Sequence, residues 1–115
     1  EVVHNTVTNN LENTFIDLID NTTITVVIAS QGYPGTFKKG IELPLLDKFD
    51  NKDDILIFHS GTAKNDNENL ISSGGRVLSV TAIGDNVQDC RQKAYKAVKE
   101  INWDNGFFRR DIGKL

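Results

Sequence analysis

The run of β-branched residues at positions 23–28 is the feature that most constrains the fold of this chain. Thr, Ile and Val side chains pack well on a pleated strand, whereas in a helix they lose rotamer freedom. Residues 55–59 (Ile-Leu-Ile-Phe-His) form a second apolar run without alternation, which predicts a strand buried on both faces. The core is therefore expected to be built on a β-sheet.

A glycine pair, Gly74-Gly75, separates two further strand-forming stretches, residues 70–73 and 76–83. Tight hairpin turns need positive φ angles, which glycine adopts without steric cost. The pattern predicts two antiparallel strands that are joined at the glycine pair. Residues 64–69 are polar and are predicted to form a turn before the hairpin.

Helical periodicity is found near both ends of the chain. Near the N-terminus, apolar residues at i, i+4, i+7 and i+8 predict an amphipathic helix: Leu11, Phe15, Leu18 and Ile19. Toward the C-terminus, Asp85 is a predicted helix cap, with Gln88 at the capping-box position. The buried stripe predicted for that second helix consists of Val87, Ala94, Val98 and Ile101.

Strands grouped between two helices predict an α+β fold with a largely antiparallel or barrel-like sheet. With 115 residues, the chain is expected to be a single domain, residues 1–115. The net charge of -3 argues against a nucleic-acid surface, and no apolar run is long enough to span a membrane. Cys90 is the single cysteine, which indicates a reducing, cytoplasmic compartment. Methionine is absent, so we expect a piece of a longer protein.

Several motifs that suggest chemistry are better explained as local structure. The loop of residues 32–40 fails the phosphate-binding loop pattern because Ile41 follows Gly40. His59 and Ser60 are adjacent on a strand, so their side chains point to opposite faces and cannot act as base and nucleophile together. The acidic pairs Asp53-Asp54 and Asp66/Glu68 are typical of solvated turns. We therefore predict no catalytic residue and no metal site in this chain.

The pair Arg109-Arg110 is a stronger candidate for a binding site. Guanidinium groups can donate paired hydrogen bonds to phosphate or carboxylate oxygens. Two readings are open from the residues alone: a solvated surface pair, or a phosphate clamp with Arg76 as a third cation. Phe107 and Phe108 would pin this segment to the core, and Asp111 would pair with one guanidinium.

Four stretches in order resemble the C-terminal domain of the phosphoribosylamine–glycine ligase family. They are TVVIASQGYPG (residues 25–35), FHSGTA (58–63), GGRVLSVTAIG (74–84), and AY (94–95) followed by FRRDIG (108–113). They span nearly the whole chain. Gln31 and Ser79 stand where the family usually has glycine, and Phe108 stands in place of a tyrosine.

The resemblance implies an ATP-grasp ligase of purine biosynthesis that joins glycine to 5-phosphoribosylamine. ATP and Mg²⁺ or Mn²⁺ would be bound by the preceding ATP-grasp core, which is absent here, so the fragment is not expected to be active alone. By analogy with related purine enzymes, Arg109, Arg110 and Arg76 would bind the substrate phosphate. Loops containing Gly32, Tyr33, Pro34, Gly35, Gly74 and Gly75 would wall the active site. The alternative is a structural or docking domain without substrate contacts.

Overall fold

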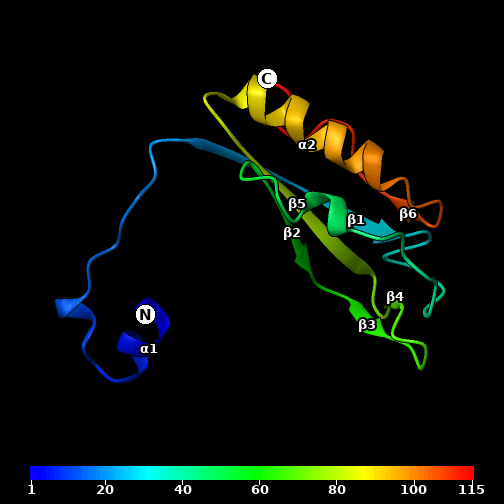
Figure 1. Cartoon of the computed structure of the whole chain (residues 1–115), viewed down its shortest axis with the longest axis horizontal. Helices are drawn as coiled ribbons and strands as arrows, with labels where there is room; N and C mark the ends of the chain where they lie inside the picture. The colour runs from blue at the N-terminus through cyan, green and yellow to red at the C-terminus, as the bar shows by residue number, and fades with distance from the viewer.

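The structure, a computed structural model, describes residues 1–115 and has the helices and strands of an α+β domain (Figure 1). None of its helices has the length and apolar character needed to cross a membrane. In chain order the elements are α1 (Val2–Val7), the 3-10 turn η1 (Leu11–Asn13), β1 (Thr22–Ser30), the 3-10 turn η2 (Asp47–Phe49), β2 (Ile55–His59), β3 (Thr62–Lys64), β4 (Leu70–Ser72), β5 (Arg76–Gly84), α2 (Val87–Ile101) and β6 (Gly106–Phe107).

The main sheet has four strands in the order β2-β5-β1-β6, and every neighbouring pair is antiparallel. β1 and β5 form its centre and pair from Thr22 opposite Gly84 to Ala29 opposite Arg76. The short strands β3 and β4 form a separate hairpin. α2 lies along one face of the main sheet (Figure 1), so the predicted α+β class with an antiparallel sheet is confirmed.

The core lies between α2 and the sheet face that it covers. Val26 and Val80, from the two central strands, are fully buried there. Burying an aliphatic side chain of this size stabilises the fold by roughly 1.5–3 kcal/mol. Cys90 is also fully buried, and its thiol donates a hydrogen bond to the Thr22 carbonyl oxygen at 2.9 Å. The buried residues that α2 contributes are Cys90, Ala94, Ala97, Val98 and Ile101.

The start of α2 differs by one residue from the prediction. Asn86, not Asp85, is the N-cap, and its side-chain oxygen accepts a hydrogen bond from the Asp89 amide at 2.8 Å. The Asp89 carboxylate in turn accepts from the Asp85 amide at 3.2 Å. With the N-cap at Asn86, Asp89 stands at the third helical position and takes the role that the sequence pattern assigned to Gln88.

The predicted hairpin around Gly74 and Gly75 is wrong. β4 pairs with β3, while β5 pairs with β1 and β2, so the segments on either side of the glycines are not partners. Neither glycine has a positive φ angle. Gly75 is instead required by close packing, since an added Cβ would overlap the ring of Tyr33. The same glycine signal can mark a turn or a close approach of two segments, and only the tertiary contacts distinguish them.

The prediction that residues 55–59 are buried on both faces is also wrong. β2 is an edge strand, and Ile55 is its one buried residue. Leu56 and Phe58 are 41% and 53% exposed, on the sheet face opposite α2. That face carries no covering element in this chain, so its apolar side chains stay in contact with solvent.

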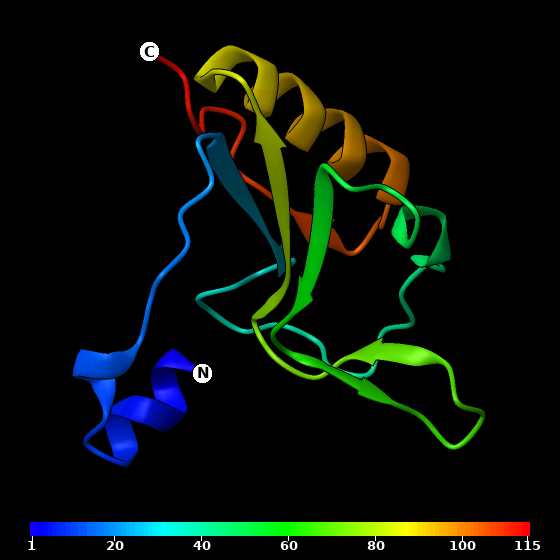
Figure 2. The same cartoon turned by 60° about the vertical axis from the view of Figure 1, so that its left-hand side comes forward.

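The predicted helix through Leu11, Phe15, Leu18 and Ile19 does not form. The chain forms the six-residue helix α1 and the turn η1, and then runs in an extended conformation into β1. The part of the chain that contains α1 and η1 lies apart from the sheet (Figure 2). None of residues 1–21 is buried. Helices this short are marginal in water without a surface to pack against, and this segment contacts none.

Candidate functional site

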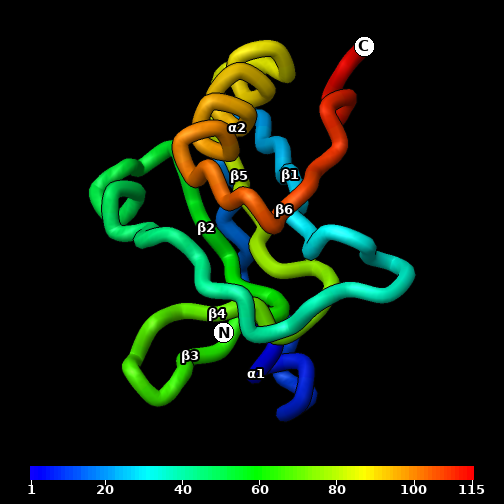
Figure 3. Tube along the Cα trace, turned by 90° about the vertical axis from the view of Figure 1, so that its right-hand side faces the viewer, coloured from blue at the N-terminus to red at the C-terminus, as the bar shows by residue number.

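Three loops meet at the end of the sheet where β1 and β2 end and β5 begins. The Ser30 amide donates to the Gly75 carbonyl oxygen at 2.7 Å, and the Ser30 hydroxyl donates to the Gly74 carbonyl oxygen at 3.0 Å. The Gly61 amide donates to the Arg76 carbonyl oxygen at 2.8 Å. Figure 3 shows the loop that follows β1 passing this end of the sheet beside the segment that leads into β5. Because neighbouring strands are antiparallel, the loops that contain the glycine-rich stretches of the sequence lie together at this end of the sheet.

The backbones of these loops touch because glycine leaves room for them. A Cβ on Gly61 would lie 2.7 Å from the Arg76 carbonyl oxygen and 2.8 Å from the Gly74 Cα. The Tyr33 ring covers Gly75 and also packs edge-on against Phe37, with ring centroids 6.1 Å apart. The ring is thereby held at a fixed place beside Arg76.

These loops enclose a hollow of about 550 Å³, here called the Arg76 hollow. It is lined by Val27, Tyr33, Ser60, Gly61, Gly75, Arg76 and Ser79. Val27 and Ser79 are register partners on β1 and β5, and they face away from α2. Arg76 is exposed and belongs to none of the ion pairs in the chain. The hollow therefore offers an uncompensated positive charge together with hydroxyl groups, and it has no acidic lining residue.

The predicted arginine pair lies elsewhere, on the loop that follows β6. Arg109 binds Asp111 through two hydrogen bonds, from Nε to Oδ1 at 2.9 Å and from Nη2 to Oδ2 at 2.7 Å. This pairing, expected from the sequence, lowers the pKa of the Asp111 carboxyl to about 2. It also raises the pKa of the Arg109 guanidinium. Much of the charge of Arg109 is thus balanced by its neighbour.

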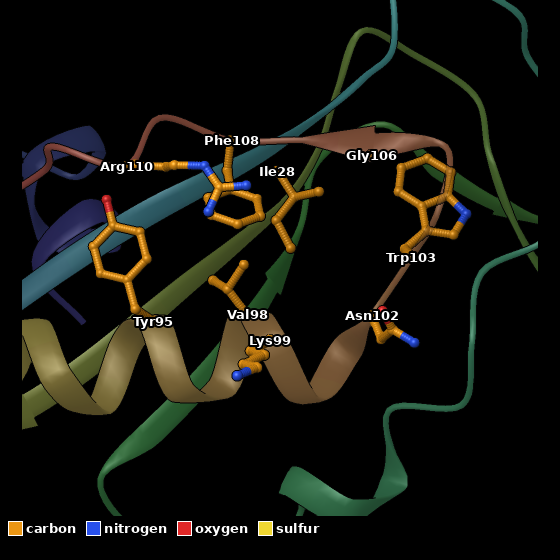
Figure 4. Close-up of a pocket in the computed structure, with 9 residues that line it drawn as sticks. All are labelled: Ile28, Tyr95, Val98, Lys99, Asn102, Trp103, Gly106, Phe108 and Arg110. Atoms are coloured by element: carbon orange, nitrogen blue, oxygen red, sulfur yellow. The ribbon is translucent and has the colours of Figure 1, made fainter.

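Arg110 has no acidic partner and lies over the Phe108 ring, 5.3 Å from its centroid. It lines a second hollow, of about 450 Å³, between α2 and the segment that contains β6 (Figure 4). Tyr95, Trp103 and Phe108 form its aromatic walls. The Arg76 hollow and this hollow share no lining residue. The structure therefore separates Arg76 from the pair with which the sequence analysis grouped it.

Two side chains of α2 fix the backbone of the arginine loop. The Tyr95 hydroxyl donates to the Arg109 carbonyl oxygen at 2.6 Å and accepts from the Ile112 amide at 3.1 Å. Arg91 donates to the carbonyl oxygens of Arg110 and Ile112, at 2.6 and 3.2 Å. Phe107 and Phe108 were predicted to pin this segment to the core; Phe108 packs against the core, while Phe107 is not among the residues packed there and lies on β6 opposite Ala29.

Some lining residues were missed by the sequence analysis. Ser60 was considered as a nucleophile beside His59, and Gly61 only as part of the FHSGTA stretch, yet both residues line the Arg76 hollow. Tyr95 and Trp103 line the second hollow. No local pattern distinguishes them as lining residues, because aromatic residues on or next to a helix are equally typical of a hydrophobic core. His59 is exposed and its Nδ1 lies 3.1 Å from the Thr62 hydroxyl, away from both hollows. No three His, Cys, Asp or Glu side chains gather as metal ligands would.

Comparison with known proteins gives a consistent match. Residues 23–115 match the family described as phosphoribosylglycinamide synthetase, C domain. The chain is 39% identical over 112 residues to phosphoribosylamine–glycine ligase of Agrobacterium fabrum, covering 97% of this chain and 26% of that protein. It is 40% identical over 115 residues to the Fusobacterium nucleatum protein of the same name, covering 99% of this chain and 27% of that protein.

A solved structure shows the same fold. The crystal structure of phosphoribosylamine–glycine ligase from Thermotoga maritima superposes with a TM-score of 0.73 and 29% sequence identity, covering 96% of this chain and 27% of that chain. The chain thus spans about a quarter of the length of the relatives that it matches. The family match over most of its residues and the shared fold together show that this chain belongs to the phosphoribosylglycinamide synthetase C-domain family.

Proposed function

We propose that this chain is the C-terminal domain of a phosphoribosylamine–glycine ligase, an ATP-dependent enzyme of purine biosynthesis in the cytoplasm. The enzyme would join glycine to 5-phosphoribosylamine and give glycinamide ribonucleotide. The family match and the relatives' names support this proposal. Because the chain spans a quarter of those relatives, we expect it to need the remaining polypeptide for activity.

The residues of this chain do not provide a site for the metal that such a ligase would use. A divalent cation bound with ATP needs convergent oxygen ligands, and no cluster of three acidic, His or Cys side chains occurs here. We therefore propose that ATP and Mg²⁺ or Mn²⁺ bind outside this chain. No nucleotide-dependent or metal-dependent step is assigned to its residues.

The role proposed for this domain is to bind the ribosyl 5-phosphate. The observation that carries the proposal is the Arg76 hollow, in which an arginine without an acidic partner lies beside a fixed tyrosine and hydroxyl groups. Arg110 is a second candidate ligand, because it also lacks an acidic partner. Arg109 would have to share its guanidinium with Asp111.

A phosphate held there would contribute to the reaction without taking part in it. A phosphate does not change during amide formation, so its binding energy can serve to orient the reacting amine. In this proposal the loops of Gly32, Tyr33, Pro34 and Gly35 and of Gly74 and Gly75 wall the substrate site. Tyr33 and Gly75 are the residues of these loops that line the Arg76 hollow.

Steady-state kinetics of the complete ligase tests this role. Arg76→Ala is expected to raise the KM for phosphoribosylamine by about 10–100-fold, since a charge-assisted hydrogen bond contributes roughly 1.5–3 kcal/mol. The KM for ATP should not change. Lys39→Ala, which removes an exposed charge from the nearby loop outside the hollow, is the matched control. Arg110→Ala, assayed in parallel, decides whether the second hollow takes part.

A docking role without substrate contacts is the second candidate function. It is favoured by the arginine loop itself, whose carbonyl oxygens and Arg109 side chain are already bound within the domain. In that case Arg76→Ala and Arg110→Ala would lower the stability of the complete ligase. The KM for phosphoribosylamine in the folded fraction would equal that of the unaltered enzyme.

A further inference from the structure

The second hollow, between α2 and the segment that contains β6, has aromatic walls that are held in place by contacts within the domain. The Tyr95 hydroxyl makes two hydrogen bonds with the backbone of the arginine loop, at 2.6 and 3.1 Å. The Trp103 Nε1 donates to the Glu42 carbonyl oxygen at 3.0 Å, and the Phe108 ring centroid lies 6.0 Å from that of Tyr95. Figure 4 shows Tyr95 and Trp103 at opposite ends of the hollow, with Phe108 between them. Because these rings are already ordered, a ligand that packs on them loses little free energy in fixing them.

The hollow also carries two positive charges that no carboxylate of this chain neutralises. Lys99 and Arg110 both line it, both are exposed, and neither belongs to an ion pair. No acidic residue lines the hollow. The Arg110 guanidinium lies over the Phe108 ring, 5.3 Å from its centroid, and this cation–π contact keeps the charge beside the aromatic wall. The whole chain has a net charge of -3, so the excess of positive charge is local to the hollow.

The interior of the hollow is apolar, and its size suits a small molecule. Ile28 and Val98, which are each 3% exposed, line it between the aromatic walls (Figure 4). Its volume of about 450 Å³ lies within the range of small-molecule sites, roughly 300–1,000 Å³. A flat ring can pack on Trp103 or Phe108 while an anionic group attached to it accepts hydrogen bonds from the guanidinium. An uncharged ring would leave both cations unpaired, and a free phosphate ion would leave the aromatic walls unused.

We propose that the second hollow binds a small planar aromatic anion, an aryl phosphate or carboxylate, with its ring against Trp103 and Phe108 and its anionic group on Arg110 and Lys99. The site is separate from the Arg76 hollow, with which it shares no lining residue. A ligand bound here therefore does not occupy the place proposed for the ribosyl phosphate at Arg76. The inference goes beyond the proposed function and does not rest on it, because every contact that carries it lies within this chain.

Isothermal titration calorimetry of the complete ligase with 1-naphthyl phosphate tests the site, and saturable binding is expected. Lys99→Ala and Arg110→Gln should each raise the Kd about 10-fold or more, because each removes a charge-assisted hydrogen bond to the anion. Trp103→Leu removes an aromatic wall and should raise the Kd about 5-fold or more. Lys96→Ala is the matched control, since it removes an exposed charge from α2 outside the hollow and should leave the Kd unchanged.

The two parts of the probe are also titrated separately. 1-Naphthol lacks the anion and inorganic phosphate lacks the ring, so each should bind at least about 10-fold more weakly than 1-naphthyl phosphate. 1-Naphthoate carries a carboxylate in place of the phosphate. Tighter binding of one of the two aryl anions identifies the anionic group that the site prefers, and binding of either supports the inference.

Four outcomes overturn the inference. The first is the absence of saturable binding with both aryl anions, and the second is an equal affinity for 1-naphthol. The third is a Kd that Lys99→Ala and Arg110→Gln leave unchanged, which would place the probe outside the second hollow. The fourth is weaker binding in Arg76→Ala alone, which would place its phosphate in the Arg76 hollow.

Two features of the assay keep its result clear. Trp103→Leu loses the hydrogen bond to Glu42. If that variant does not fold, Lys99→Ala and Arg110→Gln still decide the result, because they change exposed side chains. No ligation is measured, so failure of this inference is distinguishable from failure of the proposed function.

Discussion

Gly61→Ala is expected to destabilise the domain because the added methyl group meets backbone on two sides. Its Cβ would lie 2.7 Å from the Arg76 carbonyl oxygen and 2.8 Å from the Gly74 Cα, where ordinary contacts are 3.4–4 Å. Relief requires one of the segments to move by about half an ångström or more. That movement would strain the hydrogen bonds from Gly61 to Arg76, at 2.8 Å, and from Ser73 to Gly61, at 2.7 Å.

The expected loss follows from these two effects. Overpacking costs typically about 1–3 kcal/mol, and a weakened backbone hydrogen bond adds about 1 kcal/mol. We therefore expect a loss of about 2–4 kcal/mol in the free energy of unfolding, which lowers the Tm by about 10–20 °C for a domain of this size.

Urea and thermal unfolding, followed by circular dichroism, measure this loss. Gly35→Ala is the control, because its added Cβ would meet only the Gly32 carbonyl oxygen, at 3.1 Å, and its φ is not positive. A Gly61→Ala protein within about 0.5 kcal/mol of the unaltered one, the range of an ordinary surface substitution, would refute the argument that these backbones are closely packed.

Three further predictions concern the arginine loop and the core. Tyr95→Phe removes the hydroxyl that hydrogen-bonds to the backbone of Arg109 and Ile112, so it should lower the free energy of unfolding by about 1–2 kcal/mol. It should also speed hydrogen exchange at the Ile112 amide, and an unchanged exchange rate would contradict this prediction. Because the folded pKa of Asp111 lies near 2, below its ordinary value of 3.8, the contribution of the Arg109 pair to stability should be complete above about pH 4 and fall away as the pH drops through 2. A carboxyl NMR titration measures this, and a midpoint near 3.8 would show that the pair does not form in solution. The Cys90 thiol should react with a thiol reagent only when the domain unfolds in urea, since its side chain is fully buried.

The sequence pattern correctly predicted those elements in which the buried side chains recur with the period of a strand or a helix. β1 occupies residues 22–30, around the β-branched run, and α2 buries Ala94, Val98 and Ile101 as predicted. Such patterns succeed because one face of each element is covered throughout, so the side-chain period directly reflects burial. The pairing of Arg109 with Asp111 was predictable for a similar reason, since the two residues are separated by a single position.

The sequence by itself thus determined the α+β class, β1, α2 and, through four ordered stretches, the family. Only the tertiary structure decided that Gly75 accommodates Tyr33 instead of forming a hairpin turn, and that Arg76 and Arg110 line separate hollows. These features depend on contacts between residues far apart in the chain, which no local pattern encodes. The helix predicted near Phe15 failed because a periodic apolar stripe specifies a helix only where another surface covers it.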